Sequence, residues 1–278
     1  MPRNGSRVVP HPPDYRRGIP MSNPAPKSPW PVLGVFVLLA FAFSGLLGLF
    51  QSVIDAEALT LAQFGPALGA LATWLVYRRR LASLLPEAVS RRQVVAHTVL
   101  MVAAVAVFAL IAGALALATG QDLAGVAAVG GTPFVLYLVF QLVGAAGEEI
   151  GWRGFMQPLL ERRMARLAAA GLTGVVWAAW HVQVFATAPA VAVSFLVSTV
   201  AFAILLGYMG NGSLWQRTAT AAVGHWLINV ALNVIAGDEV NAAPQAYFTA
   251  LAAVVTTALF LALFVRARAA RERRAATA

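Results

Sequence analysis

Residues 30–50 read WPVLGVFVLLAFAFSGLLGLF, an apolar run without a single charged side chain. A helix of roughly 20 such residues crosses the hydrocarbon core of a bilayer. Further predominantly apolar runs follow along the chain, at residues 58–77, 95–118, 133–157, 172–188, 190–209, 217–236 and 247–265, and the run at 133–157 turns polar after Ala146. The sequence therefore predicts an all-α fold, a polytopic transmembrane helix bundle of about eight spans.

The composition of the chain agrees with a membrane protein. Hydrophobic residues make up 60% of its 278 residues and charged residues only 11%, whereas about 25% of the residues of a soluble domain are charged. Cysteine is absent, which excludes disulfides, thiolate metal ligands and a cysteine nucleophile.

The charged residues predict the orientation of the bundle. The net charge is +9, with 20 Lys and Arg. If eight spans alternate in direction, every basic residue falls on the side of the two termini. The charged residues of the opposite loops are all acidic, and they are Asp55, Glu57, Asp122, Asp238 and Glu239. Because Lys and Arg in short loops mark the cytoplasmic side, we expect both termini to be cytoplasmic. The charge is thus a topology signal, and no nucleic-acid partner is expected.

The chain divides into three regions. Residues 1–29 are rich in proline and arginine and predict a disordered cytoplasmic tail; residues 30–265 form the bundle, and residues 266–278 form a basic cytoplasmic tail. Polar residues in the first spans, such as Ser44 and Gln63, are isolated, and they gather only from residue 141 onward. We therefore place the functional half of the bundle at about residues 130–240. The Ala- and Arg-rich, Lys-poor composition favours a bacterial plasma membrane.

A set of polar residues inside the spans indicates a functional site, because ionisable groups at membrane depth are costly and mark function by default. The set consists of Glu148, Glu149, Arg153, His181, His225 and Asn229. With helix ends placed near residues 157, 171 and 217, the two histidines and the first glutamate share one depth, a third to a half of the way in from the cytoplasm. We expect their side chains to meet in one cavity that opens to the cytoplasm.

The spacing of these residues assigns them to helix faces. Glu149 and Arg153 are four residues apart and can pair on one face. Glu148 is offset by about 100° and less neutralised, which makes it the better candidate for a general base. A carboxylate beside histidines can deprotonate a water, directly or on a metal. Taken singly, these residues also fit structural roles, as a buried ion pair or as hydrogen-bonded core histidines.

Three short motifs carry a resemblance to a known family. They are EEIGWR at residues 148–153, WAAWH at 177–181 and HWLIN at 225–229. Together they resemble the CPBP family of intramembrane proteases, which includes the type II CAAX prenyl endopeptidases, bacteriocin-processing proteins and abortive-infection proteins. The family pattern is EExxxR, FxxxH and HxxxN on successive helices. One departure is Trp177, which stands where the family commonly has phenylalanine.

The resemblance implies an intramembrane endopeptidase that cuts membrane-associated peptides or proteins near the cytoplasmic side. Glu148 would activate the attacking water together with His181. Glu149 and Arg153 would shape the site.

The resemblance also implies roles for the last motif and leaves the metal open. His225 and Asn229 would bind a metal or stabilise the oxyanion. A glutamate and two histidines, namely Glu149, His181 and His225, would make a three-ligand Zn²⁺ site, and a metal-free glutamate mechanism is the alternative.

Two other functions fit the same residues. The glutamate and histidine cluster could serve as a proton relay in a transporter or proton-coupled carrier, although no internal repeat supports that interpretation. A non-catalytic descendant of the family could bind membrane peptides, although the intact motifs argue against this. The expected partners are a membrane-associated peptide or protein substrate and membrane lipid.

Overall fold

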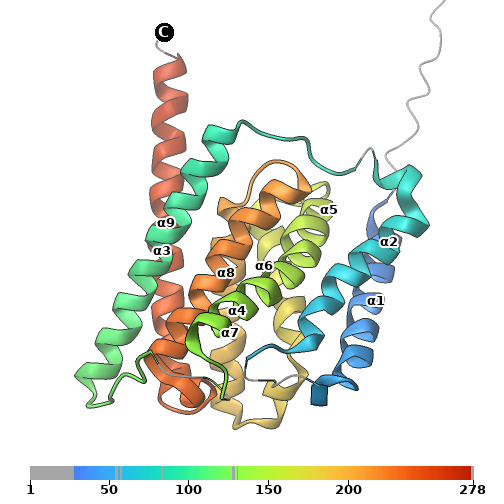
Figure 1. Ribbon diagram of the computed structural model, residues 1–278. Coiled ribbons are helices and arrows are strands. Elements are labelled where there is room, and N and C mark those ends of the chain that lie inside the picture. The colour runs from blue at the N-terminus through green and yellow to red at the C-terminus, as the bar shows by residue number, and fades with distance from the viewer. Residues whose placement is uncertain are drawn as a thin grey trace, which may run out of the picture.

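The predicted all-α bundle is confirmed by the computed structural model, which describes residues 28–276 except 54, 55, 57, 83, 127, 128 and 130 (Figure 1). Residues 1–27 of the predicted tail lie outside the described residues. The α-helices are α1 (Trp30–Gly48), α2 (Gly65–Leu81), α3 (Arg91–Ala118), α4 (Phe134–Glu149), α5 (Gln157–Glu161), α6 (Arg166–Trp180), α7 (Pro189–Met209), α8 (Leu214–Ala236) and α9 (Gln245–Ala276). Helix α9 thus continues through the predicted basic tail.

The surface of the bundle identifies the chain as an integral membrane protein. Six helical stretches are long and apolar enough to cross a membrane, whereas α2 and α6, with 17 and 15 residues, are shorter. Large apolar side chains point outward along the helices; Leu38, Leu110 and Val135 are 69%, 73% and 74% exposed. An apolar surface of this extent is unstable in water and suits contact with lipid chains.

The two ends of the bundle differ in the charges of their loops and helix ends. Helix α1 begins and α9 ends at the same end, at the top of Figure 1. The same end carries arginines in the last turn of α2 and in the first turns of α3 and α8. We call this end of the bundle the basic end. The acidic end carries Asp122 after α3 and Asp238 and Glu239 after α8. The cytoplasmic location of the basic end stays a prediction.

Polar side chains and glycines set several helix boundaries. The hydroxyl of Ser90 accepts a hydrogen bond from the Gln93 amide at the start of α3. Ser213 and Gln216 form a reciprocal capping box at the start of α8, which satisfies amides that have no partner within the helix. Helix α8 ends at Ala236 and is capped by Gly237, whose φ of 53° favours glycine.

The fourth span does not end near residue 157 as predicted. A π-helical segment, η3 (Ile150–Met156), joins α4 to α5, and the helical path continues to Glu161. Pro158 lies in the first turn of α5, a position where the missing amide of proline does no harm. The prediction was wrong because a proline at this position starts a new helical segment instead of ending the span.

The predicted depth of the site was also wrong. Helix α6 begins at Arg166 and has its C-terminal cap at His181, so this histidine lies roughly 22 Å from the basic end of its helix. The same count along α8 places His225 roughly 16 Å from that end. The fifth span begins earlier in the chain than residue 172, and the candidate site therefore lies nearer the acidic end than the sequence predicted.

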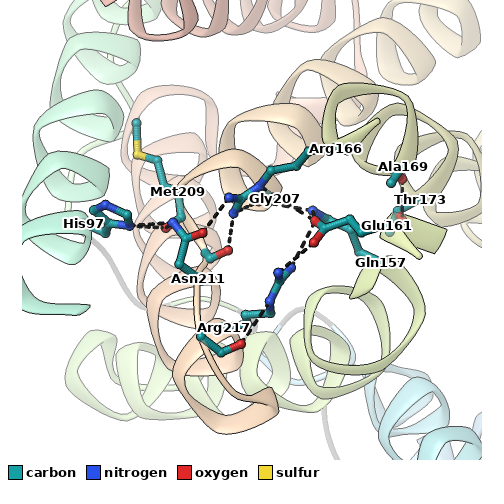
Figure 2. Close-up of polar contacts among 12 residues, drawn as sticks. His97, Gln157, Glu161, Arg166, Ala169, Thr173, Gly207, Met209, Asn211 and Arg217 are labelled. Atoms are coloured by element: carbon teal, nitrogen blue, oxygen red, sulfur yellow. Dashed lines mark hydrogen bonds and ion pairs between the residues drawn. The ribbon is translucent and has the colours of Figure 1, made fainter. Parts of the chain in front are cut away.

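A polar network fastens the helices at the basic end (Figure 2). Arg217 donates two hydrogen bonds to the carboxylate of Glu161, at 3.0 and 2.7 Å. Arg166 donates to the carbonyl of Gly207 at 2.9 Å and to the side chain of Asn211 at 2.5 Å. These contacts hold the starts of α6 and α8 against the end of α5 and α7. The charged groups of the network, Glu161, Arg166 and Arg217, are all paired with one another, so we assign it a structural role.

Candidate active site

Glu148 is held by two neutral donors from other parts of the bundle. The residue lies at the end of α4 and is 1% exposed. Its Oε1 accepts a hydrogen bond from Gln63 Nε2 at 2.9 Å, and its Oε2 accepts one from Trp177 Nε1 at 2.6 Å. The two hydrogen bonds therefore fix the orientation of the carboxylate, and neither donor carries a positive charge that would neutralise it.

Glu149 makes a different set of contacts. It is fully buried, and its Oε1 lies 2.7 Å from Arg153 Nη1 and 2.9 Å from His225 Nδ1. The i,i+4 pair of Glu149 and Arg153 is thus confirmed. Its Oε2 has no hydrogen-bond partner within the described residues. The two adjacent glutamates differ as the sequence suggested, because Glu149 forms an ion pair with Arg153 and Glu148 does not.

Trp177 connects the other members of the site. Its indole N–H bonds Glu148, the guanidinium of Arg153 lies 4.2 Å from its ring centre, and its ring meets those of His181 and His225 edge-on at 5.9 and 5.0 Å. In the sequence, Trp177 stood out only as a departure from the pattern of the resembled family. A phenylalanine, common at this position in the resembled family, has no N–H to donate.

Both histidines have one ring nitrogen oriented by an acceptor. His181 Nδ1 lies 2.9 Å from the Trp177 carbonyl oxygen, and His225 Nδ1 lies 2.9 Å from Glu149. Because these partners accept hydrogen bonds, each Nδ1 is assigned as the donor, and in the neutral ring Nε2 keeps the lone pair. An Nε2 of this kind can accept a proton during a reaction.

The predicted site residues meet beside one cavity of about 100 Å³. Trp177, His181, His225 and Asn229 line it, together with apolar side chains of α7 such as Phe195. Neither glutamate lines the cavity, but each bonds a residue that does. Residues 240 and 241 also contribute to the lining. The cavity therefore reaches toward the acidic end, contrary to the predicted opening at the other end.

Asn229 is oriented by a glutamine that the sequence reading missed. Its Nδ2 donates to Gln141 Oε1 at 3.0 Å, and Gln141 Nε2 donates to the Ala58 carbonyl at 3.1 Å. The same reading took Ser44 and Gln63 for isolated polar groups, which is wrong. The sequence did carry a signal for these contacts, since each of these polar side chains lies within an apolar run. A polar group that is buried in such a run needs a hydrogen-bond partner.

The predicted zinc ligands do not fit a metal as they are placed. A Zn²⁺ site needs its donors about 2 Å from one shared point. Glu149 already accepts from Arg153, whose positive charge would repel a metal ion, and His225 turns Nδ1 toward the same oxygen. Across the described parts of the chain, no group of three His, Asp or Glu side chains is placed to hold a metal. We therefore derive no chemical step through one.

Two comparisons with known proteins agree with the motifs. Residues 130–231 match the sequence model of a family described as type II CAAX prenyl endopeptidase Rce1-like. The chain is also 28% identical over 118 residues to the CAAX prenyl protease 2 of Methanococcus maripaludis, an alignment that covers 38% of this chain and 42% of that protein. The family match spans all three motifs and confirms the resemblance to the CPBP family. The chain thus aligns with less than half of the length of this relative.

Proposed function

We propose that this chain, whose residues 130–231 match the Rce1-like model of the CPBP family, is an intramembrane endopeptidase for membrane-associated peptides or proteins. One observation supports the proposal most strongly. Residues of three motifs on three separate helical segments join one network of contacts beside a cavity. Burying so many polar groups inside a bundle is costly, which favours chemistry over packing as their role.

In the proposed reaction Glu148 is the general base and His181 assists it. A water held by the two residues gives a proton to Glu148 while its oxygen attacks the carbonyl carbon of the peptide bond. The C–N bond then breaks, and the proton passes to the leaving amine. Each oxygen of Glu148 already accepts one hydrogen bond, but a carboxylate oxygen has a second lone pair for the water.

The remaining site residues prepare the surroundings for this step. Asn229 uses one N–H for Gln141 and has a second N–H that can donate to the developing oxyanion. Glu149 fixes the ring of His225 and balances the charge of Arg153. This division of roles needs only one of the two glutamates to change its protonation during the reaction.

The proposed orientation has a consequence for the substrate. With the basic end in the cytoplasm, His225 at roughly 16 Å and His181 at roughly 22 Å from that end place the site between the middle and the outer half of the membrane. The peptide bond that is cut would lie there as well, instead of near the cytoplasmic side.

A labelled peptide library in detergent tests the proposal. Wild-type protein should cleave members of the library, and Glu148→Gln should abolish cleavage while leaving the fold intact. Glu161→Gln is the matched control, because it changes a glutamate on the same helical path that bonds Arg217 outside the site. Cleavage that survives Glu148→Gln would refute the assigned base.

The transporter alternative receives no support from the two comparisons, which both point to endopeptidases. Proton-driven solute flux into liposomes, abolished by Glu148→Gln and without any peptide cleavage, would favour it over the proposal.

A further inference from the structure

The connection between α1 and α2 enters the bundle near the candidate site. Its residues 58–64 include the 3-10 segment η2 (Leu61–Phe64). Ala58 is fully buried, and Leu59 and Gln63 are only 6% and 9% exposed. These residues lie outside the stretch that matches the endopeptidase family, so the match assigns them no role.

Side chains from two other elements fasten this connection. Gln51 Nε2 donates to the Leu59 carbonyl at 3.0 Å, and its Oε1 accepts from the Leu61 amide at 2.7 Å. The hydroxyl of Ser44 donates to the Ala62 carbonyl at 2.9 Å and accepts from Trp180 Nε1 at 2.8 Å. The backbone of residues 58–64 is thus tied to α1 and, through Trp180, to the helix that ends at the site histidine.

Two glycines allow the connection to lie directly against α4. A Cβ at Gly144 would lie 2.4 Å from Gln63 Oε1, and a Cβ at Gly147 would lie 3.0 Å from the Gln63 carbonyl oxygen. Distances below 3.0 Å are not compatible with real side-chain contacts, so the neighbour would have to move. The amide of Gln63 therefore reaches Glu148 only because α4 has no side chain at position 144.

Glutamine is an unusual residue at a buried position whose only role is packing. Its Nε2 donates to Glu148, but its Oε1 is buried and has no partner within the described residues. An unsatisfied buried acceptor is destabilising relative to an apolar side chain of the same size. The benefit of the amide is therefore its hydrogen bond to Glu148.

We propose that residues 58–64 are a positioning element of the active site, in which Gln63 orients the carboxylate of Glu148. The same connection supports Asn229, because the Ala58 carbonyl holds Gln141 and Gln141 holds Asn229. Gln63 is a positioning residue, since it acts through Glu148. This inference rests on the proposed endopeptidase function, and it gives the first half of the chain a part in the site.

The chain offers a closely matched control for Gln63. Gln157 is also a buried glutamine whose Nε2 donates to a glutamate, Glu161, at 2.8 Å, and whose Oε1 has no partner within the described residues. It belongs to the network at the basic end (Figure 2) and does not line the cavity. Methionine at either position removes the amide and keeps the length of the side chain.

The experiment compares Gln63→Met with Gln157→Met by peptide cleavage and thermal unfolding in detergent. Gln63→Met should lower kcat roughly 10–100-fold, since displacing a reacting group by about 1 Å costs up to ~100-fold, with KM changed less than about twofold. Gln157→Met should leave kcat unchanged. Equal effects of the two variants on kcat would overturn the inference.

Gly144→Ala supplies a second variant that leaves Gln63 in the chain. It should displace the amide of Gln63 and lower kcat, and it should add little in combination with Gln63→Met, because both changes break the same contact. Fully additive losses of kcat would contradict a shared contact.

An infrared readout separates this inference from the proposed function. The carboxylate band of Glu148, taken as the difference between wild type and Glu148→Gln, should shift in Gln63→Met and stay in place in Gln157→Met. If the band shifts but no peptide is cleaved, the proposed function fails and the positioning contact stands. If peptides are cleaved and neither the band nor kcat responds to Gln63→Met, the positioning role fails alone.

Discussion

Arg153→Met tests the buried ion pair at the centre of the site. Arg153 is 1% exposed, and its Nη1 lies 2.7 Å from the fully buried Glu149. Methionine fills a similar length but leaves the carboxylate without its cation. Breaking a buried pair by removing one partner costs about 3–5 kcal/mol, and we expect the free energy of unfolding to fall by that amount. Loss of the contact between the guanidinium and the Trp177 ring adds to the effect.

Thermal unfolding in a mild detergent provides the measurement, and Arg217→Met is the matched control. Arg217 also pairs with a glutamate at 2.7 Å, but the side chain of that partner, Glu161, is 17% exposed. Because water can solvate the carboxylate that this control leaves behind, its loss of stability should be smaller.

A double variant completes the test. Glu149→Gln combined with Arg153→Met removes both charges of the pair and leaves no carboxylate at position 149 without its cation, and the new amide oxygen can still accept a hydrogen bond from His225 Nδ1. Most of the lost stability should therefore return. The reasoning is refuted if Arg153→Met unfolds at the temperature of the wild type, or if the double variant is no more stable than the single one.

Three further predictions follow from the site and the topology. Trp177→Phe keeps an aromatic ring beside Arg153 but removes the N–H that bonds Glu148; kcat for peptide cleavage should fall roughly 10–100-fold, and an unchanged kcat would contradict this role. Protein prepared with a metal chelator should contain no zinc by elemental analysis and keep its activity, because Glu149 Oε1 is already bonded to Arg153 and His225 and no three His, Asp or Glu side chains of the described residues are placed to hold a metal; recovery only with added zinc would show that the site binds a metal. Reporter fusions after residues 85 and 272 should be cytoplasmic and one after residue 122 external; the reverse pattern would overturn the orientation.

The bundle and the key side chains could be predicted because their signals are local. Long apolar runs form helices in a membrane wherever they occur, since each helix satisfies its own backbone hydrogen bonds. The pairing of Glu149 with Arg153 follows from their spacing on one helical path. The three motifs likewise indicated which residues of distant helices would meet, and the structure brings them together around Trp177 and the cavity.

Helix ends and depths could not be predicted to the same accuracy. Apolar alanines and leucines surround Gly171, so hydropathy does not distinguish a helix that starts there from one that starts at Arg166. Five residues of uncertainty correspond to more than one turn, or about 7 Å. This error was sufficient to place His181 at the wrong depth and the cavity toward the wrong end.

The sequence by itself determined that the chain crosses a membrane as a helix bundle, and it indicated Glu148, His181 and His225 as candidates for one site. Only the tertiary structure decided which groups hold them. Gln63 reaches Glu148 across 85 residues of sequence, and it does so because Gly144 leaves room for its amide. Such a contact depends on how two helices pack and not on any pattern within either one, since close packing between distant segments is a property of the whole fold.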